Sequence, residues 1–380
     1  MARPHPASIL THFAALPDPR RERRRLHRLL DLLAIAICAV IAGCDDWVEV
    51  AAYGRKKIDW LRTFLPLPNG IPSHDTFGRV FSRLDPHAFQ RCFLRWVEAV
   101  QTATGGKLVA IDGKTLRHSF DTAAGKGALH LVSAWAGQNH LVLGQRAVDG
   151  KSNEITAVPE LLALLDLTGA VVTLDAMGCQ KEIVSAIRDR GADYVITVKG
   201  NQGTLYDDLS DYFVDCLDSD FAGVPHRYQR RVERGHGRQE ARHYYVVEVP
   251  AALRTRDQWR DLRSAGMVYA ERQVGQGEVS GETRFFISSL RPEVKAFARA
   301  VRGHWGIENG LHWVLDVAFG EDQSRVRKDH GPENLAWLRR VAVSLLRNEP
   351  TKASIKCKRK MAGWDDEYLL SILLGNSGDS

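Results

Sequence analysis

Two short apolar runs in this sequence end in an aspartate, and both have the length and composition of buried strands. The first, Leu108 to Ile111, precedes Asp112, and the second, in GAVVTLDAM, precedes Asp175. Around them, strand-like and helix-like segments follow the order β-β-β-α-β-α-β over residues 107–199. This order is typical of an α/β domain whose mixed sheet carries helices on its faces.

The two aspartates have different neighbours on their C-terminal side. Asp112 precedes Gly113, and Asp-Gly is a common two-residue turn of a β-hairpin. A turn does not explain Asp175, because Ala176 and Met177 come after it. Two strand-end carboxylates on neighbouring strands repel each other, so such a pair normally implies a shared proton or a divalent cation. Mg²⁺ suits this setting because it takes few carboxylates and completes its shell with water and phosphate oxygens.

The pattern of apolar, polar and turn-forming residues along the sequence predicts four segments. We expect a helical N-terminal segment, the first part of an α/β core, a β-rich insertion and a C-terminal helical part of the core, over residues 1–104, 105–199, 200–290 and 291–380. In the first segment, short helices surround the break PLPNGIPS. This pattern fits a DNA-binding helix-turn-helix and a plain helical bundle equally well.

The net charge and the cysteines indicate which partners and which cellular compartment suit the chain. The net charge of +6 is compatible with a polyanionic partner, and the six cysteines have no metal-ligand spacing, which favours a reducing cytoplasmic setting. An apolar run over residues 29–44 follows an arginine cluster and imitates a signal peptide. We predict a buried helix instead, because 28 residues precede the run and Asp31 lies within it.

A third acidic group lies in RGHWGIENGLHWVLDVAFGED, which is predicted to be helical. His304, Glu308 and His312 are spaced i, i+4, i+8 and are expected to share one helix face. The spacing is not the H-E-x-x-H pattern, so zinc is not expected. For Trp305 and Trp313, packing in the core is the ordinary expectation.

Five motifs in a fixed order carry a resemblance to a known family. They are AIDGK, TLDAMGCQ, VKGNQ, RGHGRQEAR and HWGIEN with its following LHW, LDV and ED, and PSHDTFGRVFSRLD adds to them near the N-terminus. The chain resembles a DDE-type insertion-sequence transposase of the H-repeat-associated branch. The resemblance implies an RNase H-like core, DNA cleavage at element ends and strand transfer into target DNA.

The resemblance also implies a catalytic triad that binds metal. Asp112, Asp175 and Glu308 occupy the positions of the three acidic residues, which would hold two Mg²⁺ ions, with Mn²⁺ as a substitute. The wider superfamily places tyrosine, arginine and lysine around its glutamate. This chain has Val301, His304 and Leu315 there, so those three roles do not carry over.

Three other carboxylates compete with Glu308 for the third position: Asp316, Glu321 and Asp322. On a regular helix Asp316 falls about 80° around from Glu308 and about 12 Å further along. One metal pair is therefore not expected to use both. Glu321 and Asp322 come after Gly320, where the helix is expected to end.

DNA is the expected partner, bound by a homodimer without any membrane contact, in the cytoplasm and at the nucleoid. The arginine cluster Arg20, Arg21, Arg23, Arg24 and Arg25 is a candidate DNA contact, and Trp305 is a candidate for stacking on an unpaired base. The motif positions give the remaining candidates for phosphate contacts, each of which also fits an ordinary solvated surface residue: Lys114, Lys199, Asn201, Gln202, His236, Arg238, Arg242, His304 and Asn309.

Two alternatives remain from the sequence. One is a domesticated DNA-binding protein that cuts nothing, against which the intact acidic triad argues. The other is a resolvase-like nuclease on the same core, which cuts junctions without joining ends.

Overall fold

The structure is a computed structural model that describes residues 9–104, 108–120, 125–138, 140–148, 154–235, 237–275 and 277–374. The chain forms two compact units. The sheet unit comprises residues 107–112 and 152–307, and the helical unit comprises residues 1–106, 113–151 and 308–380. Strand β1 (Leu108–Thr115) contributes residues to both.

The strands of the described residues form one mixed sheet in the order β3-β2-β1-β4-β5-β9-β8-β7-β6, and the strands from β1 onward in this order make up the sheet of the sheet unit. Strands β1, β4 and β5 are parallel, and the pairs from β5 to β6 are antiparallel. The bounds after β1 are β4 (Val171–Leu174), β5 (Asp193–Val198), β6 (His226–Gly235), β7 (Arg238–Glu248), β8 (Ser264–Val274) and β9 (Ser280–Ser288).

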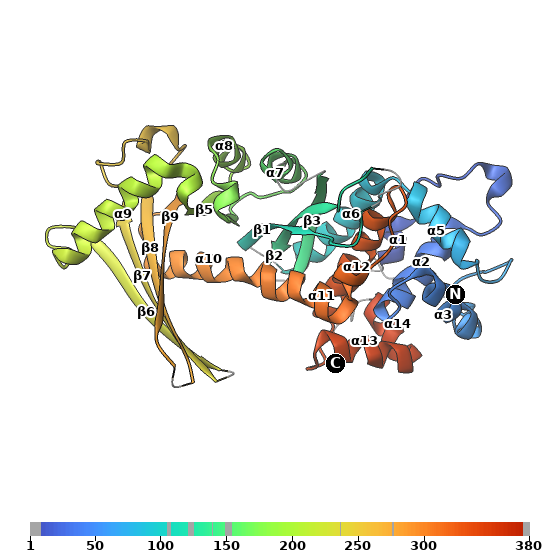
Figure 1. Cartoon of the computed structure of the whole chain (residues 1–380). Helices are drawn as coiled ribbons and strands as arrows, with labels where there is room; N and C mark the ends of the chain where they lie inside the picture. The colour runs from blue at the N-terminus through green and yellow to red at the C-terminus, as the bar shows by residue number, and fades with distance from the viewer. Residues whose placement is uncertain are drawn as a thin grey trace. The chain divides into compact units, whose positions relative to one another are not determined.

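Four helices pack on this sheet or beside it: α7 (Glu154–Ala163), α8 (Lys181–Asp189), α9 (Gly203–Asp218) and α10 (Val294–Ile307). Successive side chains of β9 point to opposite faces. Phe285 accordingly stacks on Phe213 of α9, while Phe286 meets Phe297 of α10. Helices α9 and α10 therefore cover opposite faces of the antiparallel strands, as Figure 1 shows.

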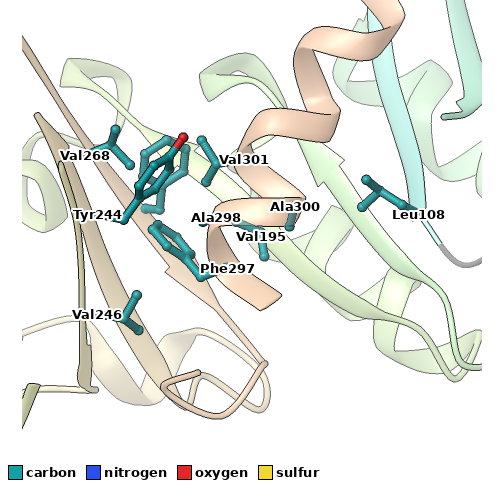
Figure 2. Close-up of a cluster of buried hydrophobic side chains, with 10 residues drawn as sticks. Leu108, Val195, Tyr244, Val246, Val268, Phe297, Ala298, Ala300 and Val301 are labelled. Carbon is teal, nitrogen blue, oxygen red and sulfur yellow. The ribbon is translucent and has the colours of Figure 1, made fainter. Parts of the chain in front are cut away.

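The core of the sheet unit forms where α10 crosses the sheet. Phe297 lies among side chains of β7, β8 and β9, and Leu108 and Val195 extend the same cluster to β1 and β5 (Figure 2). A Cβ atom on Gly266 would collide with the Phe297 ring, and one on Gly303 would collide with Leu108. These close approaches fix α10 against the sheet, because neither position has room for a side chain.

The helical unit is organised around two largely buried helices, the apolar α2 (Leu29–Ile41) and the more polar α12 (Gly331–Asn348), which pack together. The β2–β3 pair is antiparallel, and β3 also packs against α12. The remaining elements are α1 (Ile9–Phe13), α3 (Trp47–Lys56), α4 (Ile58–Leu61), α5 (His74–Arg83), α6 (Pro86–Thr104), β2 (His130–Ala136), β3 (Leu141–Val148), α11 (Trp313–Phe319), α13 (Ile355–Trp364) and α14 (Asp366–Leu374).

The fold class predicted from the sequence is confirmed. The order β1, β2, β3, α7, β4, α8, β5 is the predicted RNase H-like order, and the N-terminal region is helical. The apolar run after the arginines is the buried helix α2. Within the described residues, no helix is long and apolar enough to cross a membrane. The four-segment division and the choice between a helix-turn-helix and a bundle stay predictions.

The prediction for the insertion was incomplete. Residues 200–290 contain the 16-residue helix α9 as well as strands, and β6 was not predicted. Helix α9 buries Leu205, Leu209, Phe213 and Cys216, which follow helical spacing among polar residues. Strand β6 has almost no buried side chain and therefore lacks the apolar alternation by which a strand is recognised.

Candidate active site

Asp112 and Asp175 lie at equivalent positions on neighbouring strands, as predicted. Strands β1 and β4 are parallel, and their last paired residues are Ile111 and Leu174. Each aspartate is the next residue in the sequence: Asp175 directly follows β4, whereas Asp112 lies within β1, which continues to Thr115, so Asp112 and Gly113 do not form a hairpin turn. Because adjacent strands lie about 4.8 Å apart, this register places the two carboxylates close together, where the pairing of β1 with β4 ends.

The backbone just after β4 fixes the Asp175 side chain. Asp175 caps a 3₁₀ turn, η3 (Ala176–Gly178), and its Oδ1 accepts hydrogen bonds from the amides of Met177 at 3.0 Å and Gly178 at 3.4 Å. Burial raises the pKa of this carboxyl, and the Asp112 carboxylate raises it further. The hydrogen bond from the Gly178 N–H lowers the pKa but does not offset those effects.

Two more side chains of the sheet unit affect the pKa of Asp175 electrostatically. His304 of α10 contacts the Thr173 hydroxyl through Nδ1 at 3.1 Å and favours the ionised form of Asp175. Glu154, the buried first residue of α7, disfavours that form and raises the pKa of Asp175. The sequence did not predict Thr173 or Glu154 as site residues: Thr173 opens the TLDAMGCQ motif but only Asp175 stands out there as an acidic residue, and Glu154 lies outside the five motifs.

The donor set of this pair fits a divalent cation. It offers carboxylate oxygens, which Mg²⁺ and Mn²⁺ prefer, and Asp112 raises the pKa of its neighbour, as expected for two like charges placed side by side. Within the described residues, no group of three or more histidine, cysteine, aspartate or glutamate side chains is arranged to hold a metal. The carboxylates that the structure brings together are thus two of the three predicted ligands.

Glu308, the third predicted ligand, belongs to the helical unit and begins a π-helical turn (Glu308–His312) between α10 and α11. Single π turns within helices are frequent at functional sites. The turn corrects one expectation: Glu308 is exposed whereas His312 is buried, so these two do not share a face. The i→i+5 bonding of a π turn changes the rotation per residue, and the predicted i, i+4, i+8 face assumed a regular α-helix.

The three carboxylates that compete with Glu308 are all engaged in ion pairs within the helical unit. The Lys114 ammonium contacts Asp316, lies 3.5 Å from Glu321 Oε2 and lies 3.8 Å from Asp322 Oδ1. Glu321 also accepts from Arg340 at 2.9 Å. Burial by itself would raise the pKa of Glu321, but Arg340 and Lys114 together lower it. Of these four carboxylates, Glu308 is the one that is exposed.

The sequence matches two families along most of its length. The family described as "Transposase DDE domain" matches residues 103–345, and the one described as "DDE_Tnp_1-associated" matches residues 10–97. The chain belongs to the DDE transposase family. The family resemblance drawn from the sequence motifs is thereby confirmed.

Relatives of known sequence support this membership. "Putative transposase YncI" of Escherichia coli O157:H7 is 40% identical over 370 residues, covering 96% of this chain and 94% of that protein. "H repeat-associated putative transposase YhhI" of Escherichia coli K12 is 37% identical over 373 residues, with 97% and 98% covered. An "Uncharacterized protein in dhlA 3'region" of Xanthobacter autotrophicus is 46% identical over 281 residues, with 73% and 92% covered.

Three predicted phosphate contacts of this transposase face protein groups. Lys114 is buried among the carboxylates described above. Arg242 is buried and pairs with Glu240 at 2.6 Å and Glu233 at 3.1 Å. Burial alone would lower the pKa of Arg242, but these carboxylates raise it. His304 is partly exposed and contacts Thr173 through Nδ1. A phosphate contact by Lys114, Arg242 or His304 stays a prediction, which the carboxylate partners of Lys114 and Arg242 make less favourable.

The other candidates fall into two groups. Lys199, Arg238 and Asn309 are exposed. Asn201 and Gln202 donate to backbone carbonyls near Asp175. The guanidinium carbon of Arg284 lies over the Trp305 ring, 5.0 Å from the centroid of that ring. Trp305 is 37% exposed, against the expectation of core packing, and Trp313 is 60% exposed. His236 lies outside the described residues.

The arginine cluster near the N-terminus is not uniform. Arg20 is held by Asp18 at 2.7 Å and donates to the carbonyl of His27, also at 2.7 Å. Arg21, Arg23 and Arg24 have exposed side chains in or next to the 3₁₀ turn η1 (Glu22–Arg24). Arg25 is exposed as well, but its guanidinium donates to the carbonyl of Arg20 at 2.8 Å. Arg21, Arg23 and Arg24 are therefore the better candidates for contact with a polyanion.

Proposed function

We propose that this transposase cleaves DNA at the ends of its element and joins the freed ends to target DNA, in a phosphoryl-transfer reaction that depends on a divalent cation. The observation that carries the proposal is the placement of Asp112 and Asp175 at one register of neighbouring parallel strands. Burial and the neighbouring Asp112 charge disfavour the ionised form of Asp175, and a bound cation would relieve both effects.

Asp112 and Asp175 would hold the cation, with Glu308 as the third proposed ligand. Mg²⁺ is the proposed ion, two per site, and Mn²⁺ is its proposed substitute. When bound, the ions would activate the attacking oxygen and stabilise the leaving oxygen. Asp175 keeps its orientation through its hydrogen bonds to Met177 and Gly178, which leaves its second oxygen for the ligand. No protein nucleophile is needed, because water and then the freed 3′-hydroxyl attack the phosphate.

Cleavage of an end-containing duplex tests this proposal. The full chain is incubated with DNA that carries the element end and its flanking sequence, with Mg²⁺, with Mn²⁺ and with chelator. We expect strand cleavage at the element boundary that leaves a 3′-hydroxyl, in both metals and not in chelator. Binding of the end without cleavage in either metal would contradict the proposal and favour a non-catalytic DNA-binding protein.

We propose further that exposed basic and amide groups bind the DNA backbone, in a homodimer assembled on two ends. The groups that support this are exposed and lie at motif positions or in the N-terminal arginine cluster: Lys199, Arg238, Asn309, Arg21, Arg23 and Arg24. Each phosphate contact made by a cation releases counterions, so its contribution is measurable as a salt dependence.

The exposed arginines near the N-terminus give the first prediction. Replacing Arg21, Arg23 and Arg24 by glutamine in the full chain is expected to reduce the slope of log binding constant against log salt by about 2–3, since each phosphate contact contributes about 0.9. The matched control is glutamine at Arg55, Lys56 and Arg62, which are exposed on or beside α3 and α4. Equal slopes in the two triple variants would show that the arginine cluster only adds general charge.

The repulsion within the carboxylate pair gives a second prediction. The raised pKa of Asp175 means that its ionised form is disfavoured in the folded chain. The free energy of unfolding is therefore lowered at a pH above the pKa of the folded chain, and it is not lowered at a pH below the pKa of the unfolded chain. Asp175→Asn keeps the acceptor for Met177 and Gly178 but removes the charge, so at pH 7 without metal the variant is expected to unfold a few °C higher.

Added Mg²⁺ is expected to reverse that order. It should raise the unfolding temperature of the wild type and leave Asp175→Asn unchanged, because only the wild type offers the carboxylate pair. Asp211→Asn, at an exposed position on α9, is the control and should follow the wild type in both conditions. A metal-free Asp175→Asn that is less stable than the wild type would contradict the repulsion between Asp112 and Asp175.

A further inference from the structure

The orientation of Asp175 depends on the turn that comes directly after it. Its Oδ1 accepts from the amides of Met177 and Gly178, so the carboxylate points correctly only while η3 keeps both N–H groups in place. The turn is short, and only three residues have 3₁₀ geometry. A turn of this length holds few hydrogen bonds of its own, so its position depends on its contacts with other elements.

One side of the turn packs directly on the strand that carries Asp175. A Cβ atom added to Gly178 would lie 2.7 Å from Leu174 Cδ2 and 2.8 Å from Leu174 Cβ. No side chain fits between the turn and the end of β4. This contact fixes how closely the turn approaches the strand, but it does not fix the direction of the N–H groups.

Two side-chain amides hold the turn from the neighbouring strand. Strand β5 pairs with β4 and ends at Val198, just before the 3₁₀ turn η4 (Gly200–Gln202). Asn201 Nδ2 donates to the carbonyl of Ala176 at 2.7 Å, and Gln202 Nε2 donates to the carbonyl of Cys179 at 2.8 Å. These two carbonyls lie immediately before and after the two residues whose N–H groups hold Asp175.

We propose that Asn201 and Gln202 are positioning residues that hold the Asp175 turn, and through it the metal-binding carboxylate. The inference rests on the proposed function, because it assigns Asp175 to the metal. It also replaces the expectation that both amides bind phosphate. Each amide directs its NH₂ group at a protein carbonyl, whereas the exposed Lys199 of the same VKGNQ motif makes no side-chain hydrogen bond within the described part of the chain.

Kinetics on the full chain separates the two roles. Removal of a group that orients a metal ligand typically costs 10–100-fold in metal affinity or activity. Asn201→Ala and Gln202→Ala are therefore each expected to raise the Mg²⁺ concentration for half-maximal cleavage about tenfold, while the Kd for end DNA without metal stays within twofold of the wild type. Lys199→Ala should show the opposite pattern, with a raised Kd and an unchanged Mg²⁺ requirement.

A second measurement needs no activity. Amide hydrogen exchange of the metal-free full chain reports directly on the N–H groups of Met177 and Gly178. We expect exchange over residues 176–179 to be about tenfold faster in Asn201→Ala and Gln202→Ala, and unchanged in Gln239→Ala, a control on β7. Faster exchange in a chain that cleaves no DNA would uphold the positioning role while the proposed function fails. Wild-type exchange together with a raised Kd for DNA would overturn the inference.

Discussion

Replacing Asp112 by asparagine is expected to reduce Mg²⁺-dependent cleavage of element-end DNA by at least about 1,000-fold. The change removes a carboxylate that the proposed site uses to hold the cation, and metal catalysis contributes several kcal/mol, with each 1.36 kcal/mol equal to a factor of ten in rate. Asparagine has almost the same shape, so the strand and its register with β4 should persist. Cleavage is measured on a labelled duplex under single-turnover conditions.

DNA binding separates this loss from misfolding. The Asp112→Asn chain is expected to bind end DNA with a Kd within a few-fold of the wild type, because Asp112 makes no proposed contact with phosphate. Thermal unfolding of the same preparation without metal should show a cooperative transition at, or a few °C above, that of the wild type, because the variant also loses the repulsion with Asp175. Cleavage within tenfold of the wild type in a folded Asp112→Asn chain would remove Asp112 from the metal site.

Glu308→Gln is expected to lose cleavage by at least about 100-fold, whereas Asp316→Asn should stay within about tenfold of the wild type. Glu308 is exposed at the start of a π turn, which leaves its carboxylate accessible to a cation. Asp316 instead contacts Lys114, which also faces Glu321 and Asp322. Asp316 therefore acts in the packing of the helical unit, and its loss should lower stability more than activity.

Both variants are compared at one temperature well below their unfolding transitions, with end binding measured in parallel. Neither is expected to change the Kd for end DNA by more than a few-fold. If Asp316→Asn lost cleavage while it remained folded, and Glu308→Gln retained it, the third ligand would be Asp316. That outcome would also undo the alignment that places the glutamate at the HWGIEN motif.

The central features of the fold can be predicted from local sequence patterns. Apolar runs that end in Asp112 and Asp175 predict two strands with acidic ends, and the order of strands and helices around them predicts an α/β sheet. The structure confirms the sheet and the acidic end of β4, whereas β1 continues through Asp112 to Thr115. Buried parallel strands leave few alternatives for a continuous apolar run of this length. The sequence offers both Ser73 and Asp75 as caps for the helix that follows PLPNGIPS, and the structure uses Ser73, whose hydroxyl accepts from the amide of Thr76.

The details that the sequence did not reveal depend on contacts between distant residues. Nothing near Lys114 predicts that its ammonium pairs with carboxylates about 200 positions away, so its placement beside an acidic motif suggested a phosphate contact. The partners of the Asn201 and Gln202 amides are also hidden in the sequence, because only the pairing of β4 with β5 brings the two backbone carbonyls within reach. No residue type in the sequence marks the π turn that begins at Glu308. Regular helical spacing therefore predicts that His312 shares a face with Glu308, which is wrong because His312 is buried.

Locating bound Mn²⁺ by anomalous diffraction tests most directly the claim that Asp112 and Asp175 share a divalent cation. Crystals of the full chain are grown with Mn²⁺, and the same experiment is run on Asp112→Asn. We expect an anomalous peak bound by carboxylate oxygens of both aspartates in the wild type, and its loss in the variant. Mn²⁺ bound elsewhere in the wild type, with no peak between Asp112 and Asp175, would contradict that claim.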